Sequence, residues 1–290
     1  MSDARTGLQA LAMQLLRRNS TRLSLALLGV VFACAIAPDL LAPADPFAQD
    51  LTLRLRLPAW LGGPESAHLL GTDHLGRDVL ARLVHGARIT LVVSLLAVVI
   101  AVVIGVPAGV VAGFYGGKID MLIMRLTDMQ LAFPVILLVI AIVAMLGPSL
   151  VTVIAILGLS GWPRFARIAR GAVLGVKQLE FVDAARAIGA GDLRLMFGHV
   201  LPNTLSALIV YATFEFARMI LLEATLSFLG LGVQPPTPTW GGMINDGRPH
   251  LYVAWSLSVF PGIAIVLIIL AFNLLGDHLR DALDPHLAQD

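Results

Sequence analysis

Four charged side chains lie inside long apolar runs and are the first candidates for a functional site. They are Asp128, Glu215, Arg218 and Glu223. A charge inside a membrane segment is costly and marks a candidate functional residue. Glu215 and Arg218 have the i,i+3 spacing of a helical ion pair, and Arg125 lies one turn before Asp128. Two interpretations therefore stay open, a functional polar lining and local charge pairing.

The remaining reactive side chains do not form a catalytic or metal-binding pattern. None of the seven histidines belongs to an H-x-x-x-H pair or joins the one cysteine, Cys34, so a zinc site is not expected. No nucleophile motif is present. Cys34 has no second cysteine for an internal disulfide and lies in an apolar run, which is typical of packing.

A phosphate-binding loop is also missing. The P-loop motif G-x-x-x-x-G-K-[ST] cradles nucleotide phosphates, and the only lysines of the chain are Lys118 and Lys177. Lys118 follows a glycine, but Ala112 and Ile119 stand where the motif requires glycine and Ser or Thr. We therefore expect that this chain does not hydrolyse ATP.

The composition predicts an all-α membrane protein. Of the 290 residues, 58% are hydrophobic and 13% are charged, whereas soluble domains carry about 25% charged residues. Most of the chain is therefore expected to be solvated by lipid. The net charge of +1 gives no reason to expect a nucleic-acid partner.

Apolar runs long enough to cross a bilayer predict six membrane-spanning helices. The expected spans are residues 23–42, 88–114, 121–146, 149–171, 200–225 and 252–277. Arginines before the first span make it resemble a secretory signal, but we expect it to stay as an uncleaved anchor. Glycines spaced by four in the second span, at Gly105, Gly109 and Gly113, predict close helix packing.

The distribution of Lys and Arg predicts the orientation. It places the tails at residues 1–22 and 278–290 and the loop at residues 172–199 in the cytoplasm. Residues 43–87 then form a periplasmic loop, whose second part predicts an amphipathic helix along the outer membrane interface. Asp78 and Arg82 have the spacing of an ion pair in that helix.

The most patterned polar stretch is residues 180–203, between the fourth and fifth expected spans. One face of a first short helix is apolar and consists of Phe181, Ala185 and Ile188. Gly189 ends this helix, because glycine tolerates positive φ, and Asp192 is placed to cap a second amphipathic helix. Two short helices that meet at a glycine corner predict a surface element that offers one side to another molecule.

The same stretch resembles the EAA loop of the membrane subunits of bacterial ABC importers. The matching residues are Glu180, Ala184, Ala185, Gly189, Leu201 and Pro202. In that family the loop is the coupling helix that docks on the ATP-binding subunit, and the resemblance implies this role for these residues and for Phe181. The alternative is an ordinary linker with chance periodicity.

Three further stretches, residues 71–88, 226–244 and 271–285, resemble the dipeptide, oligopeptide and nickel permeases of that family. With the loop they cover the chain from about residue 65 to the end, and their order resembles the C-type subunit of the dipeptide kind. The resemblance implies the membrane fold of a type I importer with six spans, the first at residues 23–42 and the other five in a transmembrane domain at residues 88–277. It also implies a permease in the bacterial inner membrane that moves dipeptides or short oligopeptides by alternating access, not an enzyme.

The resemblance further implies a set of partners. They are a second homologous permease subunit, two ATP-binding subunits, a periplasmic or lipid-anchored substrate-binding protein, and membrane lipid. ATP and Mg would be bound by the ATPase subunits, with no cofactor in this chain. Asp128, Glu215, Arg218 and Glu223 then become candidates for the pathway or its gate, or for pairing against the partner permease.

Two other functions remain open at this stage. One is a permease of the same branch for nickel, glutathione or another small solute. The other is a stand-alone channel or membrane enzyme, which would not need the loop at residues 180–202.

Overall fold

A computed structural model describes residues 19–61 and 68–283, and its regular structure over these ranges is helical. Five helices are long and apolar enough to cross a membrane, and the count rises to 6 if one bent helix pair is a single span. The long helices are α2 (Asn19–Ile36), α4 (Val79–Tyr115), α7 (Leu150–Val176), α10 (Leu201–Phe228) and α12 (Ser256–Leu283). The predicted all-α membrane fold is therefore confirmed.

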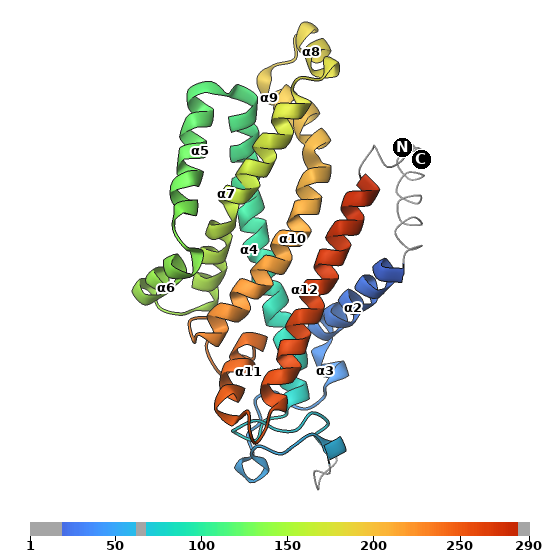
Figure 1. Ribbon diagram of the computed structural model, residues 1–290, viewed down its shortest axis with the longest axis vertical. Helices are drawn as coiled ribbons and strands as arrows, with labels where there is room; N and C mark the ends of the chain where they lie inside the picture. Colours follow the sequence, from blue (N-terminus) through green and yellow to red (C-terminus); the bar gives the residue numbers. More distant parts are fainter. Residues whose placement is uncertain (1–18, 62–67, 284–290) are drawn as a thin grey trace.

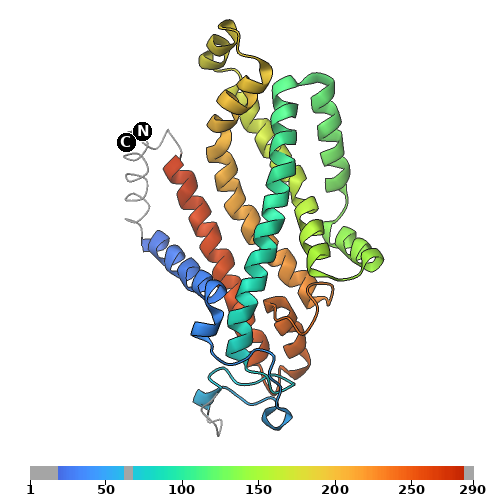
Figure 2. The ribbon, with the colours of Figure 1, turned by 180° about the vertical axis from the view of Figure 1, so that it is seen from behind.

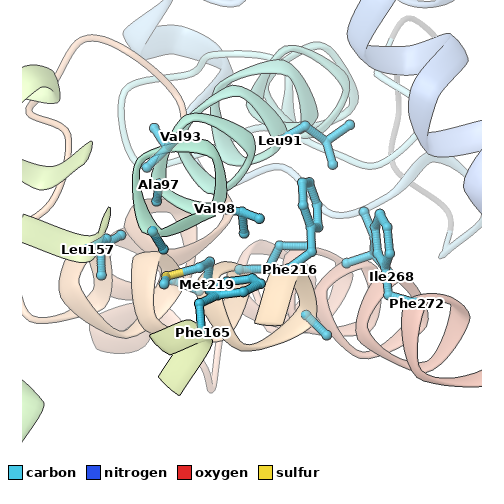
Figure 3. Packing of buried hydrophobic residues seen from close by; sticks show 14 of the residues in the cluster. Leu91, Val93, Ala97, Val98, Leu157, Phe165, Phe216, Met219, Ile268 and Phe272 are labelled. Carbon is cyan, nitrogen blue, oxygen red and sulfur yellow. The ribbon is translucent and has the colours of Figure 1, made fainter. Parts of the chain in front are cut away.

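The centre of the bundle is formed by α4, α7, α10 and α12: α4 packs on α7 and α10, and α10 packs in turn on α12 (Figures 1 and 2). The buried side chains there are apolar and include Leu157, Phe165, Phe216, Met219 and Phe272 (Figure 3). The rings of Phe216 and Phe272 lie 4.4 Å apart and join α10 to α12. These helices form one hydrophobic core that can carry the polar sites described below.

Small residues allow α4 and α7 to approach closely. A Cβ atom on Gly105 would lie 2.4 Å from the carbonyl oxygen of Trp162, and one on Gly109 would lie 2.2 Å from that of Ala166. Gly113 meets Val173 in the same way, at 2.9 Å. No side chain fits at these distances, so the predicted glycine seam is confirmed, and it sets the distance between the two helices.

The third expected span, residues 121–146, is not one straight helix. It consists of α5 (Gly117–Ala132) and α6 (Val135–Leu146), which are bent by 83° at residues 133–134. Pro134 has no N–H to donate and disfavours a helical conformation at Phe133, whose ψ is 132°. The apolar run concealed this break because hydropathy does not report backbone direction.

The expected interfacial helix is the first part of α4 and not a separate element. Asp78 caps α4 by accepting a hydrogen bond from the Ala81 N–H at 2.6 Å, and it lies 2.7 Å from His68 Nδ1. Arg82 is buried and lies 3.4 Å from Asp73, so the expected pair of Asp78 with Arg82 is wrong. Long-range acidic partners replace the local one.

The segment after α10 folds back onto the bundle as α11 (Trp240–Gly247). The Trp240 indole N–H donates to the Leu83 carbonyl at 2.9 Å, which ties α11 to α4. A Cβ atom on Gly241 would lie 2.2 Å from the Ala224 carbonyl oxygen, so α11 also lies directly against α10. We call this end of the molecule the α11 end, and the opposite end, which carries α8 (Glu180–Ala187), the α8 end.

The first expected span, residues 23–42, consists of α2 and the short α3 (Pro38–Leu41), with a break at Ala37. α2 packs against α4 and α12, and Ser20 Oγ lies 2.9 Å from His278 Nε2 on α12. The expected cytoplasmic tails lie mostly outside the described residues, at 1–18 and 284–290, as does part of the expected periplasmic loop, at 62–67.

Candidate functional site

The loop between α7 and α10 lies at the tip of the α8 end, beyond the helix ends of the bundle (Figure 1). It contains α8, the short α9 (Asp192–Arg194) and the π-helical η3 (Leu195–Val200), which runs directly into α10. Near the loop, Lys177 Nζ donates to the Gly113 carbonyl at 2.7 Å and so ties the end of α7 to α4.

One side of this loop packs inward and makes the loop a compact unit. The inward side chains are Val182, Ala185, Leu195, Met196 and Val200, all buried. The Ala190 N–H also donates to the Ala185 carbonyl at 3.1 Å. Ala185 was expected on the docking surface, but it is 8% exposed and helps hold the loop together. Ala184 is exposed and is the residue available for contact.

The loop also exposes large apolar side chains. We call this set the loop patch: Leu179, Phe181, Ile188, Leu193 and Phe197. Ile188 is 88% exposed and Leu193 is 69% exposed. Exposed apolar groups beside a polar loop mark a surface that binds another molecule. The sequence named Phe181 as a site residue but not Ile188 or Leu193, although both belong to its apolar periodicities.

Gly189 has φ +88°, and no atom lies within 4 Å of the position that a Cβ atom would take. It is therefore required for the left-handed turn after α8 and not for close contact. Glu180 is exposed in the first turn of α8, where a negative charge interacts favourably with the helix dipole. The corner between two short helices was expected from the sequence, and the structure has it at this position.

The second helix of the loop differs from expectation in two ways. Gly191 and not Asp192 is the N-cap, and no side chain caps the helix. The fifth expected span, residues 200–225, does not begin as a separate helix near Leu201 and Pro202, because the helix is continuous from Asp192 to Phe228. A π-helical turn precedes Pro202, and the Leu201 N–H donates to the Met196 carbonyl, five residues back.

Glu215 and Arg218 form the expected ion pair on α10. Arg218 Nε donates to Glu215 Oε2 at 2.8 Å, and the Tyr211 hydroxyl donates to the same oxygen at 3.1 Å. The Glu215 side chain is 1% exposed, so its charge is fully enclosed by these donors. On α7, Arg164 Nη1 is buried without a hydrogen-bond partner in the part of the chain that the structure describes.

Glu223 lies two helical turns from Glu215, about 12 Å along α10, and belongs to a different environment. It is fully buried and accepts hydrogen bonds from Ser227 Oγ at 2.7 Å and Thr90 Oγ1 at 3.2 Å. These contacts connect α10 to α4. They fit the interpretation of local polar packing for Glu223.

Asp128 is paired with a different arginine from the one expected. Its partner is Arg167 on α7, and not Arg125 on its own helix. One turn nearer the α8 end of α7, Arg170 Nη2 donates to Asp120 Oδ2 at 2.6 Å. Arg167 and Arg170 both lie on α7, within the fourth expected span, but the sequence analysis did not name them as site residues. Their i,i+3 spacing was the available signal that one helix face carried both.

These charges line a cavity between α5 and α7, which we call the α5–α7 pocket. Its volume is about 510 Å³, and its lining residues are Asp120, Met121, Met124, Arg125, Asp128, Arg167 and Arg170. The four candidate charges of the sequence are therefore distributed over three places: this pocket, the Glu215–Arg218 pair and the Glu223 contact. They do not form one cluster.

A further charge cluster at the α11 end escaped the sequence analysis. Asp73 lies 2.6 Å from Arg77 Nε and 3.4 Å from Arg82 Nε. Both arginines also face Asp246 of α11, at 3.7 and 3.6 Å. The cluster joins the segment before α4 to α11. Across residues 19–61 and 68–283, no group of three or more His, Cys, Asp or Glu side chains could hold a metal ion.

The arrangement of the helices matches the membrane domains of ABC importers. Inward-facing structures of the MetNI methionine ABC transporter align with 70% of this chain and 97% of theirs, with a TM-score of 0.58 and 21% identity. An amino acid ABC transporter crystallised with histidines aligns with 70% of this chain and 94% of its own, with a TM-score of 0.54 and 17% identity. At these identities the match shows the fold alone.

The sequence defines the family. Residues 105–289 match the model of the binding-protein-dependent transport system inner membrane component, and the chain belongs to that family. It is therefore a permease subunit of an ABC importer, a multi-pass inner-membrane transport component and not an enzyme. Such importers work with ATPase subunits, which bind the ATP, and with substrate-binding proteins.

Curated relatives are similar over most of their length. The di/tripeptide transport system permease DppC of Pseudomonas aeruginosa is 48% identical over 258 residues, 89% of this chain and 85% of the relative. The glutathione transport system permease GsiD of Escherichia coli is 48% identical over 225 residues, 78% and 74% of the two chains. The dipeptide transport system permease DppC of Haemophilus influenzae is 40% identical over 269 residues, 91% of each.

Proposed function

We propose that this permease subunit transports short peptides, with dipeptides and tripeptides as the main class. The support is the similarity to permeases named for di- and tripeptides over 89% of the chain. Permeases named for glutathione are similar over 78%. Glutathione is itself a modified tripeptide with free carboxylates, so both sets of relatives agree on a small, carboxylate-bearing peptide. Nickel is the less supported alternative within the branch.

The loop at the α8 end couples this subunit to an ATP-binding partner. The observation that carries this proposal is the loop patch, which exposes five large apolar side chains on a loop that is internally packed. A partner surface that covers the patch would remove it from water, at about 25 cal/mol for each Å² of apolar surface. Glu180 supplies a polar group to this interface and Phe181 an apolar contact. Ala184 lets the partner approach closely, and Gly189 forms the corner between the two short helices. Ala185, Leu201 and Pro202 support the loop from inside and from its base.

The loop transmits movement because it is stiff and continuous with long helices. α10 continues from the loop without interruption, and α7 leads into it. A displacement of α8 therefore moves α7 and α10 together, and the glycine seam passes the movement to α4. A second permease subunit, two ATPases and a binding protein would complete the importer, with both termini and α8 in the cytoplasm. Alternating access then follows from rigid rotation of the helices.

Uptake by the complete system tests the substrate proposal. The permease is purified with its partner permease, ATPases and binding protein, and reconstituted into proteoliposomes. We expect ATP-dependent uptake of labelled dialanine that an excess of unlabelled dipeptide or tripeptide competes for. Competition by Ni²⁺ with none by peptides would refute the proposal, and competition by glutathione alone would narrow it to that tripeptide.

A further inference from the structure

The α5–α7 pocket carries one more positive charge than negative. Three arginines and two aspartates line its volume of about 510 Å³. Cavities of about 300–1,000 Å³ are typical of small-molecule sites. The pocket lies between two helices of the membrane domain, where α5 runs alongside α7 (Figures 1 and 2).

Both aspartates are already used by arginines of α7. Asp120 holds Arg170 through two hydrogen bonds, at 2.5 Å to Nε and 2.6 Å to Nη2. Asp128 holds Arg167. Each carboxylate therefore neutralises one guanidinium and fixes its position on the wall of the pocket.

Arg125 is the third arginine of the pocket lining, and neither aspartate of the lining pairs with it. Within residues 19–61 and 68–283 it makes no ion pair or side-chain hydrogen bond, and its side chain is exposed to the pocket. It lies eight residues into α5, about 12 Å from the start of that helix, so it is not at the helix end. A guanidinium stays protonated at all relevant pH values. Helix α5 passes as a membrane span only together with α6, and a charged side chain within a span requires an anion or water.

We propose that the α5–α7 pocket binds an anionic group on Arg125, either the carboxylate of a peptide in transit or the phosphate of an anionic lipid. The planar guanidinium fork matches both chemistries. The excess of a single positive charge fits one anionic group and not several. The peptide case rests on the proposed function, whereas the lipid case is independent of it. Basic pockets between membrane helices on the cytoplasmic side do bind lipid headgroups.

Chemical labelling of the assembled transporter in nanodiscs tests this proposal. Phenylglyoxal modifies exposed arginines, and mass spectrometry gives the rate at each site. Dialanine and its C-terminal amide are compared in nanodiscs of phosphatidylcholine alone and with added phosphatidylglycerol. Arg54, which is exposed and lies far from the loop at the α8 end, is the internal control. Protection of Arg125 by dialanine but not by the amide identifies a peptide carboxylate, and protection by phosphatidylglycerol without peptide identifies a lipid.

Substitution gives the matched control. Arg125→Gln should weaken the binding of labelled dialanine, or of labelled phosphatidylglycerol, by about 10- to 100-fold, the effect of losing a hydrogen bond to a charged group. Lys118→Gln removes an equal charge from α5 but does not line the pocket, so it should leave that binding unchanged. Co-purification of the ATPase shows that each variant is folded and assembled.

Two outcomes would overturn the proposal. If Arg125 reacts slowly with phenylglyoxal under every condition, the partner permease covers it. If Arg125 reacts equally fast with and without each anion, the pocket binds no anion. Uptake by the unmodified transporter is measured alongside. Normal peptide uptake with no protection of Arg125 rejects only the pocket, whereas lipid protection without any peptide uptake rejects only the substrate class.

Discussion

Ala184 and Ala185 are neighbours in the sequence but have opposite roles in the loop. Ala184 is exposed, whereas Ala185 is buried against the rest of the loop. A small exposed residue allows a partner surface to approach the helix closely. We therefore propose that Ala184, and not Ala185, is the position at which the ATPase approaches the loop.

Ala184→Arg should weaken ATPase binding and leave the permease itself intact. A long charged side chain in a packed interface costs about 1–3 kcal/mol by overpacking alone. We therefore expect co-purification of the ATPase and ATP-driven uptake to fall together, with a normal amount of inserted permease. Ala185→Arg is the contrast, because it should disrupt the loop itself and lower the amount of folded protein. Normal ATPase binding and uptake in Ala184→Arg would show that this face of the loop is not part of the ATPase interface.

At the scale of elements, the arrangement of loops at opposite ends of the bundle makes the orientation testable. Residues 43–61 and α11 lie at one end, and α8 lies at the other (Figure 1). Ala48 and Asp183 are both exposed and are suited to labelling.

Single cysteines in a Cys34→Ala background should report the orientation. A cysteine at Ala48 should react with a membrane-impermeant maleimide added outside the inner membrane, because residues 43–61 are proposed to be periplasmic. A cysteine at Asp183 should react only after the membrane is opened. The reverse pattern would invert the whole topology and place the α8 end outside.

The seam between α4 and α7 gives a second prediction for an element. Gly109→Leu should prevent normal assembly of the bundle, because a Cβ atom there would lie 2.2 Å from a backbone oxygen. Overpacking of this kind costs about 3 kcal/mol or more. Gly171→Ala on α7 is the control, since no atom lies within 4 Å of its Cβ position. Size-exclusion chromatography measures the folded fraction, and equal profiles for the two variants would contradict the seam.

At the scale of the whole molecule, the surface of the chain indicates an assembly. Charged and half-exposed side chains of α5 and α7, such as Asp128 and Arg167, are unfavourable against lipid and require water or another subunit. The loop patch likewise requires a cover. In an isolated permease the charged side chains of α5 and α7 would face lipid, and the apolar loop patch would face water.

The permease expressed alone should therefore be unstable and inactive. Co-expression with a second, homologous permease and the ATPase should raise the amount of monodisperse protein several-fold and restore uptake. Thermal denaturation followed by size-exclusion chromatography gives the comparison. A fully active homodimer with no second permease would contradict the pairing.

The sequence by itself determined the class of fold and the family, and it predicted the two short helices of the loop at residues 180–203. Hydropathy identified the membrane helices because burial in lipid is a property of each residue summed over about 20 positions. The glycine spacing predicted the seam for a similar reason, since positions four apart share one helix face. The corner at Gly189 could also be predicted from the sequence, because it depends only on the local conformation of the chain.

The tertiary structure decided which charges meet and which face of the loop is free. Asp128 pairs with Arg167 and not with Arg125, and Arg82 pairs with Asp73 and not with Asp78. Residue spacing along one helix cannot predict such pairs, because the partners come from other parts of the chain. The bend at Pro134 and the burial of the Ala185 side chain likewise depend on the path of the backbone through space. Periodicity fixes the faces of a helix, but only packing determines what each face contacts.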